Sequence, residues 1–190
     1  MRVRNILPPA QTLFWWRFLH YNIMTGARVH HMNPAVSDEC HICNSGRETV
    51  GHLFWYCNKV RQFWGQVYQL LQLLAPGFQV PVPELSIVVN PFLSFPKSLS
   101  PIFVTVHGFA MWSVWKLYLG VIFEGKPFHL LALEELFLSF VSSHIRTLFL
   151  SACKGKKVKG FVKVWGESPL IRVRDSCMRS KSKQTTYLSP

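Results

Sequence analysis

The chain is poor in acidic residues. Its 190 residues include nine Asp and Glu against 21 Lys and Arg, which gives a formal net charge of +12 at pH 7. The two aspartates, Asp38 and Asp175, lie far apart in the sequence. Polymerases and nucleases that use two metal ions hold Mg²⁺ with several clustered carboxylates. No Gly-rich phosphate loop and no Ser/His/Asp set stands out either, so we expect that this chain is not an enzyme.

An uninterrupted apolar run is missing from the first residues, where Pro8, Pro9 and Arg17 break the pattern. We therefore expect no signal peptide. The five cysteines are too few and too unevenly placed for a disulfide scaffold, because Cys153 and Cys177 lie far from the other three. These features predict an intracellular protein of the nucleus or cytoplasm, not a secreted one.

Positive charge is concentrated near the end of the sequence. Residues 1–31 carry four arginines and no acid, residues 32–145 have a net charge of −1, and residues 146–190 have a net charge of +9. A basic tail on a near-neutral body fits a polyanionic partner, either nucleic acid or an anionic membrane surface. A tail that is merely solvated is the alternative.

Three cysteines and one histidine cluster within 18 residues in the pattern C-x2-C-x8-H-x4-C. The candidate ligands are Cys40, Cys43, His52 and Cys57. Three thiolates and one imidazole suit tetrahedral Zn²⁺, and four protein ligands leave no open position for catalysis. The pattern predicts one structural Zn²⁺. The alternatives are cysteines that only pack in a core, or a nitrogen ligand drawn from His30, His31 or His41.

The residues around the cluster follow a recognisable order. A helix with tryptophans comes first, then a Thr-Gly-Ala-Arg-Val step, the C-x2-C pair, a Glu-Thr-x-x-His-Leu-Phe-x-x-Cys run, and a later tryptophan. The matching residues are Trp15, Trp16, Leu19, Thr25, Gly26, Ala27, Arg28, Val29, Glu48, Thr49, His52, Leu53, Phe54, Cys57 and Trp64.

Over residues 13–75 this order resembles the zinc-binding domain that follows the polymerase core in LINE-type (non-LTR) retrotransposon reverse transcriptases. The resemblance implies a non-catalytic part of an RNA-directed DNA polymerase, whose parent polyprotein would carry the polymerase and an endonuclease. It also implies that the rest of a reverse transcriptase is a partner, and that the chain is a truncated remnant of a transposable element.

Apolar periodicity predicts a mainly α fold. Helices are expected over 12–24, with Thr12 as its cap and Gly26 at its end, over 50–74, over 102–123 and over 130–150. His52 and Cys57 would lie about 140° apart on an undistorted helix. We therefore expect the backbone to bend between them.

Four regions follow from these elements. They are a zinc-stapled helical module (1–75), a Pro-rich linker (76–101), an apolar helical pair (102–150) and a basic tail (151–190). The run from Ile102 to Phe123 is long enough to cross a bilayer. Lys116 and His107 inside it favour a core helix instead, so we expect no membrane contact.

The basic tail contains the residues expected to bind RNA or DNA. Alternating runs over 161–165 and 170–174 suggest a β-hairpin as one option, and Phe161 and Trp165 could stack on unpaired bases or pack on the body. The candidate nucleic-acid residues are Lys154, Lys156, Lys157, Lys159, Lys163, Trp165, Arg172 and Arg174.

Three functions fit the sequence. The first is a zinc-binding, nucleic-acid-associating module. The second is a zinc-stapled protein–protein interaction module that uses exposed aromatic residues and the Pro-rich segment. The third is a small membrane-anchored protein spanning the bilayer with residues 102–123.

Overall fold

The computed structural model describes residues 6–74 and 100–165 of the chain. The described residues form helices and turns, and their one β-type pairing is an isolated bridge between Glu39 and Arg47. This confirms the predicted mainly α fold. The chain divides into two compact units, residues 1–141 and 142–190, and the boundary falls inside one long helix, α6 (Leu130–Lys154).

The first helix, α1 (Pro9–Leu19), begins and ends earlier than the sequence predicts. Pro8 and Pro9 start it, since proline is already fixed in a helical φ and needs no donor in the first turn. Thr12 does not cap it, and its hydroxyl donates instead to the Leu7 carbonyl at 3.2 Å. Gly26 was expected to end this helix, which was wrong, because Gly26 is the first residue of α2 (Gly26–Met32).

The predicted helix over 50–74 is interrupted at Cys57. A π-helical turn, η2 (His52–Tyr56), precedes the break, and α3 (Asn58–Leu74) follows it. Cys57 itself has an extended ψ of 121°. The expected bend between His52 and Cys57 is therefore confirmed.

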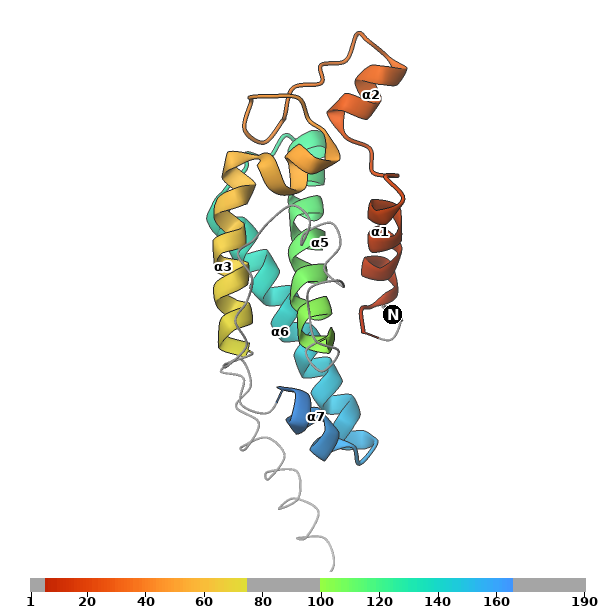
Figure 1. The fold of residues 1–190 in the computed structure, drawn as a ribbon, viewed down its shortest axis with the longest axis vertical. Coiled ribbons are helices and arrows are strands. Elements are labelled where there is room, and N and C mark those ends of the chain that lie inside the picture. The colour runs from red at the N-terminus through yellow and green to blue at the C-terminus, as the bar shows by residue number, and fades with distance from the viewer. Residues whose placement is uncertain (1–5, 75–99, 166–190) are drawn as a thin grey trace, which may run out of the picture. The chain divides into compact units, whose positions relative to one another are not determined.

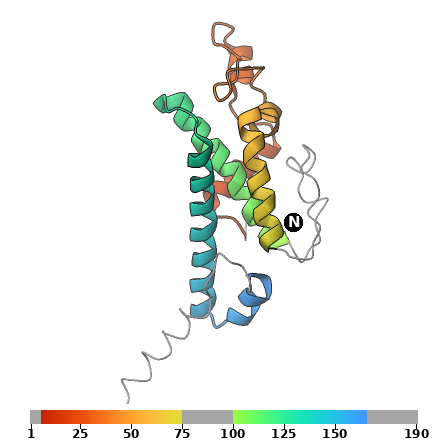
Figure 2. The ribbon, with the colours of Figure 1, turned by 90° about the vertical axis from the view of Figure 1, so that its left-hand side faces the viewer.

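Helix α5 (Ser100–Glu124) is the core helix of the first unit. It lies between α1 and α3 (Figure 1), and its contact with α3 is also visible from the second direction (Figure 2). Nearly every residue from Ile102 to Val114 is buried, as expected for a helix that is apolar on all sides. The first half of α6 joins the same core, where Phe137 meets Phe63 edge-on at 5.3 Å between ring centroids.

The first unit extends beyond the predicted zinc module, because α5 and the start of α6 belong to it. The Pro-rich segment over 76–99 lies outside the described residues.

Two helices, α5 and α6, are long and apolar enough to cross a membrane by length and composition. In α5 the most apolar window is 56% buried inside the protein, against 22% in α6. A core helix of a soluble protein meets the same criterion. The packing of α5 against α1 and α3 matches the core-helix interpretation.

The second unit contains the end of α6 and the short helix α7 (Val158–Trp165). Lys156 adopts a left-handed φ of 55° in the turn that joins them. Phe161 and Trp165 lie one helical turn apart, and Phe161 packs on Phe149 of α6 at 5.4 Å between ring centroids. The strand predicted over 161–165 is therefore wrong, and the one predicted over 170–174 lies outside the described residues.

Candidate metal centre

Four side chains converge where the loop over residues 40–46, called the knuckle below, meets the start of η2. The ligand atoms of Cys40, Cys43, His52 and Cys57 all lie within 4.8 Å of one another. A tetrahedron with Zn–S bonds of about 2.3 Å has edges of about 3.8 Å, so this spacing fits one ion. The four residues form a compact Cys3His site that suits a structural Zn²⁺, as the sequence predicted.

A tight turn presents the first two thiols. The Asn44 amide donates to the Cys40 carbonyl at 2.7 Å, and the Cys40 amide donates to the Gly46 carbonyl at 3.0 Å. Asn44 and Gly46 both have positive φ angles, 53° and 71°. A Cβ at Gly46 would lie 3.4 Å from the His52 ring, so glycine serves both the turn and the close approach of the imidazole.

The π-helical turn solves the geometric problem posed by His52 and Cys57. An α-helix would aim residues i and i+5 in different directions, but a π-turn joins them by an i→i+5 hydrogen bond. The Cys57 amide donates to the His52 carbonyl at 2.7 Å, which is this bond. The imidazole Nε2 consequently lies 3.3 Å from the Cys43 sulfur, and Nε2 is the nitrogen that would bind the ion.

Neighbouring residues hold this turn in place. The Thr49 hydroxyl accepts the His52 amide at 3.0 Å, which satisfies a donor at the helix start. The indole of buried Trp64 donates to the Phe54 carbonyl at 2.7 Å, and the Lys59 ammonium donates to the Ile42 carbonyl at 2.8 Å. These bonds tie η2 and α3 to the knuckle and give Trp64 of the sequence pattern a structural role.

The two buried thiols, Cys40 and Cys57, have pKa values shifted in opposite directions. A hydrogen bond between the two thiols raises the pKa of Cys40, with burial as a further cause, and lowers the pKa of Cys57. The lowered pKa shifts Cys57 toward the thiolate, and the raised pKa shifts Cys40 toward the thiol. Because zinc binds the deprotonated form, it must displace the proton that the pair retains.

Glu48 is the residue whose role sequence reasoning missed. Its carboxylate is fully buried and accepts hydrogen bonds from three parts of the chain. Oε1 accepts the Gly26 amide and the Tyr118 hydroxyl, each at 2.6 Å, and Oε2 accepts the His41 amide and its ring Nδ1–H, each at 2.9 Å. The start of α2, the knuckle and α5 therefore meet at one carboxylate.

The other candidate nitrogen ligands, His30, His31 and His41, are not among the four clustered residues. The His41 ring is held by Glu48, and His30 Nδ1 donates to the Val36 carbonyl at 2.6 Å, so neither belongs to the four-residue cluster. Burial, together with the bond to Glu48, raises the pKa of Tyr118 and keeps its hydroxyl protonated as a donor. In the sequence, the role of Glu48 was indicated only by its place in the Glu-Thr-x-x-His run that carries the family resemblance.

The candidate nucleic-acid-binding residues differ in their exposure, and two of them lie outside the described residues. Lys154, Lys156, Lys157, Lys159 and Lys163 are all exposed in the second unit, and they form no ion pair with any described carboxylate. Trp165 is 5% exposed and stacks on Phe161, so its predicted role in base stacking does not fit. Arg172 and Arg174 lie outside the described residues.

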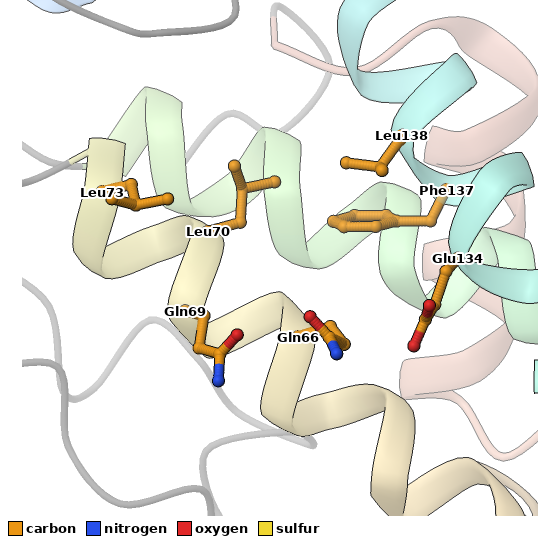
Figure 3. A pocket seen from close by; sticks show the side chains of 7 residues that line it. All are labelled: Gln66, Gln69, Leu70, Leu73, Glu134, Phe137 and Leu138. Atoms are coloured by element: carbon orange, nitrogen blue, oxygen red, sulfur yellow. The ribbon is translucent and has the colours of Figure 1, made fainter. Parts of the chain in front are cut away.

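A hollow of about 170 Å³ lies between α3 and the first half of α6 (Figure 3). Gln66, Gln69 and Glu134 provide its polar lining, while leucines and Phe137 provide the rest. Glu134 is the one titratable side chain among these lining residues, and its neighbour Glu135 is exposed.

The comparison with known families agrees with the metal site. Residues 3–64 match the sequence model of a family described as zinc-binding in reverse transcriptase, and the match contains all four ligands. This family description names a zinc-binding function and no catalytic one. No curated protein and no solved structure matches the chain.

Proposed function

We propose that this chain is a non-catalytic, zinc-stapled module that associates with single-stranded RNA or DNA. The observation that carries the proposal is the Cys3His site inside a segment that matches a reverse-transcriptase zinc-binding family. We further propose that the chain derives from the C-terminal region of a LINE-type reverse transcriptase as a remnant of such an element. The rest of such an enzyme is then a candidate partner.

The zinc site has a structural role in this proposal. Binding of structural zinc to small modules is worth about 10–16 kcal/mol, comparable to the stability of a whole domain. The site joins the knuckle to η2 and α3. Glu48 connects the knuckle to α5, because it accepts the hydrogen bond of the Tyr118 hydroxyl. The three thiols must stay reduced, which fits a nuclear or cytoplasmic location. The burial of α5 favours a function away from membranes.

The exposed lysines of the second unit support a nucleic-acid partner. Five cations without a described carboxylate partner leave their charge available to phosphates. If all five neutralise phosphates of a single strand, log Kd should rise with log salt with a slope of about 3.5. Because Phe161 and Trp165 are buried, this unit contributes charge and not base stacking.

The test measures binding of the zinc-loaded full chain to labelled single-stranded RNA and DNA as the salt concentration is varied. Replacing the five lysines by glutamine should weaken binding and remove most of the salt dependence. The matched control replaces Lys116 and Lys126, exposed lysines of the first unit, and should leave binding nearly unchanged. Binding that is absent, or that ignores salt, would show that the proposal is wrong.

Exposed apolar residues favour a protein partner as the second candidate. Phe123 at the end of α5 and Leu131 at the start of α6 are 79% and 73% exposed. Contiguous exposed apolar patches often mark protein interfaces, so this candidate requires that the two side chains share one surface. Sedimentation of the zinc-loaded chain distinguishes this function, because Phe123→Ser with Leu131→Ser should abolish any self-association.

A further inference from the structure

The outer face of α1 carries large side chains that the fold leaves uncovered. Leu13 and Trp16 are each 52% exposed, although Phe14, Trp15 and Phe18 of the same helix are buried in the core. With Pro9 and Thr12, these two residues line an open hollow of about 610 Å³ within the described part of the chain. The stripe follows the 3–4 residue spacing of one helix face.

The indole of Trp16 is held in a fixed orientation. It stacks on the His20 imidazole at 4.3 Å between ring centroids, with 28° between the ring planes. The His20 Nδ1–H donates to the Trp16 carbonyl at 2.8 Å, which fixes the imidazole as well. A flat ring that is already ordered loses little side-chain entropy when another flat ring stacks on it.

Two exposed arginines bring positive charge to the C-terminal end of α1. Arg17 follows Trp16 in the helix and is exposed, and exposed Arg28 donates to the carbonyl of Tyr21, two residues after the end of α1, at 2.6 Å. Neither arginine pairs with a carboxylate among the described residues. The first 31 residues contain no acid at all. The face therefore suits a ligand that combines flat apolar rings with negative charge.

We propose that this face binds single-stranded nucleic acid, with an unpaired base stacked on Trp16 and neighbouring phosphates contacted by Arg17 and Arg28. Stacking on an exposed aromatic residue tolerates any base, since every base has a π-face. The inference rests on the proposed nucleic-acid function and adds a second contact to it. The first unit supplies base stacking, and the lysines of the second unit supply charge.

The experiment titrates the zinc-loaded full chain into fluorescein-labelled oligouridine and oligothymidine of about 12 nucleotides. Fluorescence anisotropy gives Kd between about 50 and 200 mM salt. Trp16→Leu should raise Kd by about 5- to 140-fold, the factor expected for one lost stacking contact. Its salt slope should match that of the wild type, whereas Arg17→Gln should lower the slope by about 0.7.

Phe123→Leu is the matched control. It also replaces an exposed aromatic residue by leucine, but it lies beside Glu124 and away from the arginines. Because Phe123 belongs to α5 and not to the proposed binding face of α1, the Kd of this variant should equal that of the wild type. Trp16→Phe keeps an aromatic ring and should bind within a few-fold of the wild type, and far-UV circular dichroism checks that each variant is folded.

Cross-linking gives a readout that needs no variant. Ultraviolet irradiation of the wild-type complex with a 4-thiouridine oligonucleotide should label a peptide that contains Trp16. Labelling confined to residues 142–165 would overturn the inference.

The outcomes separate this inference from the proposed function. If Trp16→Leu binds like the wild type while the five-lysine variant does not, the α1 contact is wrong and the proposed function stands. If the wild type binds neither oligonucleotide, both are wrong. If Trp16→Leu changes self-association and leaves nucleic-acid binding intact, the face is a protein interface and the inference fails.

Discussion

Removal of one hydroxyl, in the variant Tyr118→Phe, tests how the zinc site is joined to the core helix. The hydroxyl donates to Glu48 Oε1 at 2.6 Å, and both side chains are buried. A hydrogen bond to a buried charged group contributes about 1.5–3 kcal/mol. After the substitution, Oε1 keeps only the Gly26 amide as a donor. We expect the zinc-loaded protein to lose about 2 kcal/mol of its free energy of unfolding.

Such a loss is large against a total stability of about 5–15 kcal/mol for a typical domain. Urea unfolding followed by far-UV circular dichroism measures it as a lower midpoint with an unchanged slope. Tyr68→Phe is the matched control, because the Tyr68 hydroxyl is also buried but has no hydrogen-bond partner in the described part of the chain. Removing it should leave stability unchanged or raise it.

Comparison of the urea midpoints of Tyr118→Phe and Tyr68→Phe tests the role of the bond to Glu48. If both variants shift the midpoint equally, the loss reflects packing at a buried tyrosine and not the bond to Glu48. If Tyr118→Phe has no effect, the reasoning that joins the knuckle to α5 through Glu48 is refuted.

Three further predictions follow from the same structure. Cys43→Ser should abolish stoichiometric zinc by metal analysis and lower the helicity of the first unit, while Cys153→Ser should change neither. Gly26→Ala should destabilise by about 1–3 kcal/mol in urea unfolding, because its Cβ would lie 3.0 Å from Glu48 Oε1. Gly65→Ala, in open space on α3, should instead stabilise by about 0.5–1 kcal/mol. His107→Leu should lose less stability in acid than the wild type. Burial lowers the pKa of His107 from 6.5 to about 3, so the unfolded chain takes up the proton at a higher pH than the folded chain does. Stability is then lost as pH falls below about 6.5, by about 1.4 kcal/mol per pH unit. Because the zinc ligands also gain protons in acid, the effect is read from the difference in free energy of unfolding between variant and wild type. If this difference does not change with pH, the prediction is wrong.

Local sequence patterns predicted much of this structure. The four zinc ligands followed from ligand chemistry and spacing, and the bend before Cys57 followed from the angle between His52 and Cys57 on a helix. Apolar periodicity predicted helices over 50–74 and 102–123, which correspond to α3 with the preceding turn and to α5. Each of these conclusions depends on residues that are close in sequence.

The errors have physical reasons as well. Glu48 and Tyr118 are 70 residues apart, and no local pattern pairs them. In the run from Phe161 to Trp165, the spacing of the two aromatic residues fits one face of a helix as well as one face of a strand. Packing of Phe161 on Phe149 favours the helix. The sequence of residues 161–165 alone does not predict that contact.

The π-helical turn between His52 and Cys57 should tolerate substitutions better than deletions. Leu53 and Phe54 could be exchanged for other apolar residues with a modest loss, because the turn is defined by its backbone bond. Deleting one residue would convert the turn to ordinary helical geometry and rotate a sulfur away from the ion. For the four residues between His52 and Cys57, the number of residues therefore matters more than their identity.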